Sequence, residues 1–85
     1  MLIWWDYSEV LKRYASGDIL VEADTIEEGR EIVLRDFEVF IKKRYDYLFY
    51  DGEEEIEEKR ELLRRDVAKT PHILHKGAVF IEGSA

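Results

Sequence analysis

The sequence predicts an α+β fold: a small three-stranded sheet packed by one long helix, with a second, charged helix and a short N-terminal helix. Three observations support this. Apolar runs bounded by turn residues indicate strands, apolar residues repeating at helical spacing indicate helices, and capping residues mark the helix starts. A chain of 85 residues is enough for one domain and too short for two, so residues 1–85 form a single domain.

The first half of the chain contains two predicted strands and two predicted helices. The aromatic-rich run Leu2–Trp5 suits a strand. A capping-box pattern and one apolar face then predict a short helix over Tyr7–Ala15. Alternating apolar residues predict a second strand over Asp18–Ala23. The long helix, Thr25–Arg44, has an acidic first turn and a basic last turn, as the helix dipole favours.

The second half predicts one more helix and one more strand. Residues Glu53–Lys69 carry a thin apolar stripe on an otherwise charged helix, which ends before Pro71. The nearly all-apolar run Gly77–Gly83 is typical of a strand buried on both faces. The aromatic segment Tyr45–Gly52 fits a helix end, an irregular hinge or a short strand.

The long predicted helix carries more apolar surface than a single sheet can cover. Ile32, Leu34 and Val39 widen its apolar stripe to more than half the circumference, roughly twice the arc of about 100° that a surface helix needs. A second helix or a second chain must cover the remainder. Gly29 lies within this helix, either because a neighbouring element approaches closely or as a tolerated defect.

Composition limits the class of protein and its habitat. Hydrophobic residues make up 46% of the chain and aromatic residues 13%, which suits a packed core. The absence of Cys excludes disulfides and thiolate metal sites. Asn and Gln are also absent and charged residues reach 39%, a composition typical of a thermophilic organism or its virus. In a short chain, chance is the alternative explanation.

The acidic net charge of −7 disfavours nucleic acid as a partner, because Lys and Arg contacts to phosphate supply most of that affinity. The N-terminal run lacks the basic region and cleavage pattern of a signal peptide, and no segment is long and apolar enough to span a membrane. The sequence therefore predicts an intracellular, cytoplasmic protein without a membrane partner.

The two histidines are a weak candidate metal site. On a helix, His72 and His75 would share a face and could ligate one metal ion. The preceding Pro71 favours an extended backbone instead, which sends residues three apart to opposite faces. A site would also need a carboxylate, such as Glu22 or Glu82. The alternative roles are packing on the sheet and a pH-sensitive contact.

Other catalytic motifs are missing. None of the serines stands in a G-x-S-x-G pattern, and the glycines form neither a dinucleotide-binding nor a phosphate-binding loop. The sequence therefore predicts a non-catalytic protein with no cofactor. The basic run Lys42, Lys43 and Arg44 has two explanations. Positive charges are stabilised by the dipole at a helix C-terminus, or these residues contact nucleic acid together with nearby tyrosines.

These observations favour a protein-interaction module that forms a homodimer. Large aromatic residues concentrate at interfaces, and the wide apolar arc of the long helix needs a cover. The predicted interface residues are Ile32, Leu34, Val39, Tyr45, Tyr47 and Tyr50. A different protein is the alternative partner. The alternative functions are a nucleic-acid-associated accessory protein and a small metal-dependent enzyme that uses His72 and His75.

Overall fold

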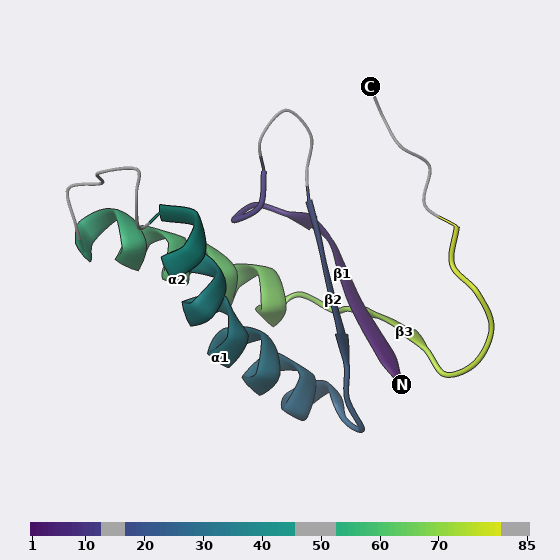
Figure 1. The fold of residues 1–85 in the computed structure, drawn as a ribbon. Coiled ribbons are helices and arrows are strands. Elements are labelled where there is room, and N and C mark those ends of the chain that lie inside the picture. Colours follow the sequence, from purple (N-terminus) through teal and green to yellow (C-terminus); the bar gives the residue numbers. More distant parts are fainter. Residues whose placement is uncertain (13–16, 46–52, 81–85) are drawn as a thin grey trace.

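The computed structural model describes residues 1–12, 17–45 and 53–80 and shows an α+β arrangement (Figure 1). Within these residues, a three-stranded antiparallel sheet is packed on one face by two helices. The elements in chain order are β1 (Leu2–Ser8), β2 (Gly17–Glu22), α1 (Ile26–Tyr45), α2 (Glu53–Ala68) and β3 (His72–Leu74). The predicted α+β class is confirmed.

The sheet has the order β2-β1-β3, so β1 is its centre. Ile3 of β1 pairs with Val21 on one side and with Ile73 on the other. In the next row, Trp4 lies between Leu20 and His72. Because paired residues share a face, Ile3 and Val21 point toward the helices while Trp4 and Leu20 point away from them.

An irregularity near the end of β1 changes which residues face the helices. The register with β2 shifts between Trp5 and Ser8, and Tyr7 has a positive φ of 52°. A bulge of this kind inserts an extra residue and resets the alternation of side chains. Trp5 and Ser8 are therefore both buried, whereas the side chain of Tyr7 is exposed.

The predicted helix over Tyr7–Ala15 is wrong. Tyr7 and Ser8 belong to β1, and a turn follows in which the Lys12 amide donates to the Glu9 carbonyl. Residues 13–16 lie outside the described part of the chain. The physical reason is a long-range contact: the side chain of Asp66 in α2 accepts the Glu9 and Val10 amides, which replaces the hydrogen bonds that a helix would supply.

The third strand lies earlier in the sequence than predicted. The strand is His72–Leu74, directly after α2, and residues 77–80 of the predicted Gly77–Gly83 strand are not in the sheet. Residues 81–83 lie outside the described part. Gly77 has a φ of 120°, a conformation that favours glycine and turns the chain out of the strand direction.

The core lies between the sheet and the two helices. Gly29 is buried because α1 comes very close to the sheet: a Cβ atom there would lie 2.7 Å from Ile3 Cδ1 and 3.2 Å from Val21 Cγ1. The close-approach explanation of this glycine is therefore the one that the structure supports. The buried hydrophobic residues are Ile3, Trp5, Val10, Val21, Ala23, Val33, Phe37, Ile41, Leu63 and Val67.

Two side chains cap the C-terminal end of α2 and tie it to the rest of the core. The last carbonyls of a helix lack partners within the helix. Arg30 Nε of α1 donates to the Val67 carbonyl at 2.7 Å, and Trp5 Nε1 of β1 donates to the Lys69 carbonyl at 3.0 Å. These bonds hold the end of α2 against both α1 and β1.

Candidate interaction surface

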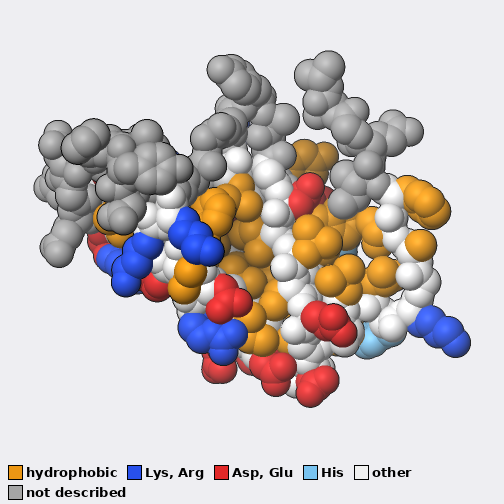
Figure 2. All heavy atoms as spheres, viewed as in Figure 1, with side chains coloured by type: hydrophobic (Ala, Val, Ile, Leu, Met, Phe, Trp, Pro, Cys, Tyr) orange, Lys and Arg blue, Asp and Glu red, His pale blue; other side chains and the backbone are white. Residues whose placement is uncertain are grey.

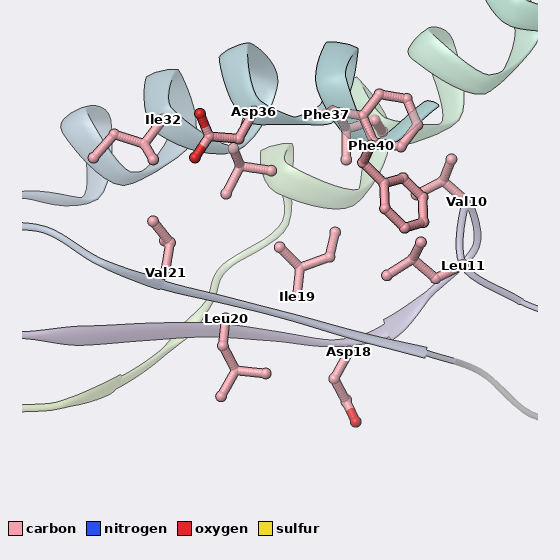
Figure 3. Close-up of a pocket in the computed structure, with 12 residues that line it drawn as sticks. Val10, Leu11, Asp18, Ile19, Leu20, Val21, Ile32, Asp36, Phe37 and Phe40 are labelled. Carbon is pink, nitrogen blue, oxygen red and sulfur yellow. The ribbon is translucent and has the colours of Figure 1, made fainter. Parts of the chain in front are cut away.

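A groove runs between β2 and α1 along one side of the molecule. Its volume is about 300 Å³. In Figure 3, Ile32, Asp36 and Phe40 of α1 face Ile19 and Val21 of β2 across it. The lining also includes Asp18 and Leu20 of β2 and, beyond the residues already named, Val10, Leu11, Val33, Phe37 and Leu63. We refer to it as the β2–α1 groove; its wall is mostly apolar.

The outer edge of β2 borders this groove. In the described residues, β2 pairs with β1 alone, so one row of its backbone N–H and C=O groups has no strand partner. Leu20 and Asp18 point to the opposite side of the strand from the groove (Figure 3). Figure 2 shows hydrophobic side chains gathered on this side of the molecule. An unpaired edge beside an apolar groove is a template for a further strand.

One flank of α1 extends the apolar surface away from the groove. Ile32 is half-buried at the groove wall, and Val39 lies two turns further along the same side of the helix. Val39 is 58% exposed and Phe40 is 41% exposed. The structure therefore brings two of the predicted interface residues, Ile32 and Val39, to one surface. Phe40 is not among the predicted interface residues, and the structure adds it to this surface.

Leu34 lies on the other flank of α1. It is 38% exposed and borders a shallow depression together with Arg64 and Val67 of α2. The second helix borders Leu34 but leaves it exposed to about the same extent as Phe40, whereas Val39 on the opposite flank is more exposed.

The remaining predicted interface residues cannot be placed on this surface. Tyr45 is the last residue of α1, and its side chain lies outside the described part, as do Tyr47 and Tyr50. Among the predicted nucleic-acid contacts, Lys42 and Lys43 are exposed on α1. Arg44 belongs to α1 as well, but its side chain is not among those described.

The two histidines occupy different environments. His72 is in β3, where its Nε2 lies 3.0 Å from Asp6 Oδ2 and its ring centroid lies 4.7 Å from that of Trp4. His75 is exposed beyond the end of the strand. The extended backbone predicted after Pro71 is confirmed. Across residues 1–12, 17–45 and 53–80, no group of three or more side chains is arranged to hold a metal ion.

The sheet face opposite the helices is apolar at its centre and acidic around it. Trp4 lies in the middle of this face, with Leu20 paired beside it, and its Nε1 donates to Asp18 Oδ1 at 3.2 Å. Asp6 and Glu22 are also on this face. Asp6, Asp18 and Glu22 thus place three acidic side chains around Trp4 on this face.

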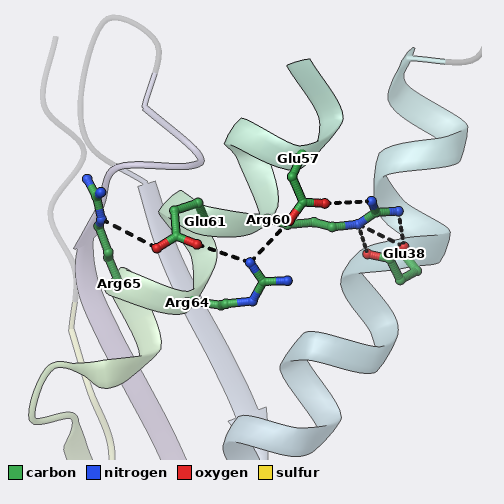
Figure 4. A network of polar contacts seen from close by, with 6 residues as sticks. All are labelled: Glu38, Glu57, Arg60, Glu61, Arg64 and Arg65. Atoms are coloured by element: carbon green, nitrogen blue, oxygen red, sulfur yellow. Dashed lines mark hydrogen bonds and ion pairs between the residues drawn. The ribbon is translucent and has the colours of Figure 1, made fainter. Parts of the chain in front are cut away.

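In the described part of the chain, one ion pair, between Arg60 of α2 and Glu38 of α1, joins the two helices (Figure 4). Arg60 donates from Nη2 to Glu38 Oε1 at 2.7 Å and from Nε to Glu38 Oε2 at 3.0 Å. The hydrogen bond from Arg60 holds the pKa of the Glu38 carboxyl below its usual value. On α2 itself, Glu57 contacts both Arg60 and Arg64. Of the contacts drawn in Figure 4, the Arg60–Glu38 pair joins the two helices, and the others lie within α2.

Asp66 of α2 is almost completely buried, with 1% of its surface exposed. Its carboxylate accepts the Ser8 hydroxyl at 2.7 Å and the Glu9 and Val10 amides at 3.0 and 3.1 Å. Lys69 Nζ lies 3.7 Å away. This arrangement fixes the turn after β1 to α2. The sequence signal for it is an acid three residues from Leu63, within the apolar stripe of α2.

Comparison with protein-family models, with curated proteins and with solved structures finds no match to this chain. In the described part, neither helix has the length and apolar character needed to cross a membrane. The function must therefore be inferred from the surface itself.

Proposed function

We propose that the protein is a non-catalytic interaction module that self-associates through the β2–α1 groove and the adjoining flank of α1. The observation that carries this proposal comes from residues 1–12, 17–45 and 53–80: among them, the β2 edge has no strand partner and lies beside an apolar groove and two exposed apolar side chains, Val39 and Phe40. Contiguous apolar surface of this kind marks interaction sites in soluble proteins.

Energetics favour covering this surface. Each Å² of apolar surface removed from water stabilises a complex by about 25 cal/mol before the costs of association. Backbone groups along the β2 edge add directional hydrogen bonds, which define how a partner sits. A second copy is the partner with the simplest geometry, because closed dimers use the same surface patch on both subunits.

Nucleic-acid binding has less support. The exposed Lys42 and Lys43 supply two positive charges. The chain as a whole carries a net charge of −7, and the open sheet face presents Asp6, Asp18 and Glu22. A gel-shift assay at low salt tests this alternative, and we expect no shift.

The proposed self-association is tested by light scattering on a sizing column over a range of protein concentration. We expect the wild-type protein to have twice the 10.2 kDa mass of one chain. Val39→Lys places a charge on the exposed flank and should raise the dimer dissociation constant by at least about tenfold, since each tenfold change corresponds to about 1.4 kcal/mol.

Leu34→Lys is the matched control, because it makes the same kind of change on the opposite flank of the same helix. It should leave the dimer intact. Circular dichroism confirms that both variants fold. A wild-type protein that stays monomeric at millimolar concentration, or a dimer that responds to Leu34→Lys instead of Val39→Lys, would contradict the proposal.

A further inference from the structure

We infer that the occupant of the β2–α1 groove is the segment Gly77–Phe80 of a second copy, added to β2 as an antiparallel strand. This inference rests on the proposed self-association and specifies how it occurs. In the described part of the chain, Phe80 is the most exposed large hydrophobic side chain, at 93%. An aromatic side chain left in water is the natural ligand for an apolar groove on another copy.

The segment has the composition of a strand. Val79 and Phe80 belong to the residue types that favour extended structure, and Ala78 and Gly77 are small enough to lie near a neighbouring backbone. The positive φ of Gly77 directs the chain away from the β3 edge of its own sheet. In Figure 1, the segment lies on the side of the sheet opposite the helices.

Side-chain sizes match the groove when the added strand runs antiparallel to β2. Successive side chains of a strand alternate, so Ala78 and Phe80 share one face and Val79 takes the other. With Val79 opposite Leu20, Ala78 lies opposite Val21 near Ile32, and Phe80 lies opposite Ile19 near Phe40. The small Ala78 therefore lies at the end of the groove formed by Ile32. The ring of Phe80 lies beside Phe40, where aromatic pairing adds to the burial of apolar surface.

Charge also favours the antiparallel direction. Lys76 precedes the segment and in this direction falls beyond Glu22 at the end of β2, close to the exposed Asp24. In the parallel direction, Lys76 would instead approach Gly17, at the other end of β2. Leu11 lies close to Gly17, so the neighbouring exposed Lys12 would bring a second positive charge near Lys76. Opposite charges across strands stabilise pairing and like charges oppose it.

Two other occupants fit less well. The protein's own segment follows β3, which is at the far edge of the sheet from β2. The other alternative is antiparallel pairing of β2 with β2 of a second copy, centred on Leu20. In this pairing, Asp18 of each copy lies opposite Glu22 of the other, and like charges directly opposite are destabilising. Exchange of Gly77–Phe80 between two copies fills both grooves and closes the assembly as a dimer.

The test uses cysteines, because the natural chain has none. The single variants Leu20→Cys and Val79→Cys carry tags of different mass, are mixed, and are oxidised under native conditions. We expect a disulfide between the two variants to be the main product, since Leu20 and Val79 are opposite in the proposed register. The same mixture oxidised in urea controls for random collision. A main product that joins two Leu20→Cys chains would overturn the inference in favour of β2–β2 pairing.

A second measurement separates this inference from the proposed function. Phe80→Asp changes an exposed side chain outside the core and should leave the monomer folded. We expect light scattering to show at least a tenfold rise in its dimer dissociation constant. If Phe80→Asp dimerises like the wild type while Val39→Lys does not, self-association stands and the occupant is wrong. If the wild type never dimerises, both proposals fail.

Discussion

Asp66 is the residue on which the connection between β1 and α2 depends. Both of its carboxylate oxygens accept hydrogen bonds from the Ser8–Val10 segment, and the Ser8 hydroxyl in turn accepts the Leu11 amide. A buried carboxylate is costly unless its acceptor sites are filled. Here they are filled from a turn that is distant in sequence, so the same contacts stabilise the turn and make burial of the charge tolerable.

Replacing Asp66 with Ala should lower the free energy of unfolding by about 3 kcal/mol, because two backbone amides and a hydroxyl lose their partner inside the protein. Urea denaturation followed by circular dichroism measures the change. Glu58→Ala is the control, since Glu58 is exposed on α2, and it should change stability by less than about 0.5 kcal/mol. Equal effects of the two substitutions would show that Asp66 has no special role.

At the scale of elements, α2 is attached to α1 by apolar packing and by the Glu38–Arg60 pair. Leu63 and Val67 of α2 are buried in the core. Arg60 of α2 makes a bidentate contact to the Glu38 carboxylate of α1. The pair is partly exposed, with side-chain exposures of 35% and 41%, so solvent screens it. Its contribution is therefore a modest supplement to the apolar contacts.

The Glu38–Arg60 pair predicts a pH dependence of stability. Since the pKa of Glu38 is lowered in the folded protein, its contribution is present above the ordinary value of 4.5 and is lost as the pH falls through the lower folded value. Glu38→Gln should therefore be destabilising near pH 7, by less than about 1 kcal/mol. The difference between variant and wild type should shrink below pH 4.5 in urea denaturation series. A difference that grows in acid would contradict this assignment.

Elements with strong local patterns could be predicted from the sequence. The predicted long helix, Thr25–Arg44, and the observed α1, Ile26–Tyr45, differ by one residue at each end, because caps and apolar spacing act within the helix itself. The Tyr7–Ala15 helix was wrong because Asp66, far away in the sequence, stabilises a turn there. Local spacing of Tyr7 and Val10 carries no information about such a contact.

The candidate surface could be predicted only in part, for a related reason. Helical periodicity identified Ile32 and Val39 as excess apolar surface, and both lie on the flank beside the groove. Periodicity cannot show which flank α2 borders, so the sequence places Leu34 in the same interface although it lies on the flank beside α2. The free edge of β2 depends on strand order, which follows from the pairing of β3 with β1 and leaves no local trace in residues 17–22.

At the scale of the whole molecule, the described residues form a small domain around a hydrophobic core, and within them the sheet has an open face and an open edge. A chain of this size buries only about 60% of the surface that its unfolded form exposes. Phe80, Val39 and Leu20 remain at least half exposed, at 93%, 58% and 50%. In the proposed dimer, such side chains are buried between two copies, which adds to stability without enlarging the domain and links folding to association.

This link predicts that thermal stability depends on protein concentration. For two chains that unfold and separate together, a tenfold rise in concentration adds about 1.4 kcal/mol per dimer. With the typical unfolding entropy of a domain of this length, the melting temperature should rise by about 4 °C per tenfold increase. Differential scanning calorimetry over a hundredfold range measures the slope. Val39→Lys should melt at a temperature nearly independent of concentration, because its unfolding begins from the monomer, whereas a flat slope for the wild-type protein would mean that the exposed apolar surface is not covered by a second copy.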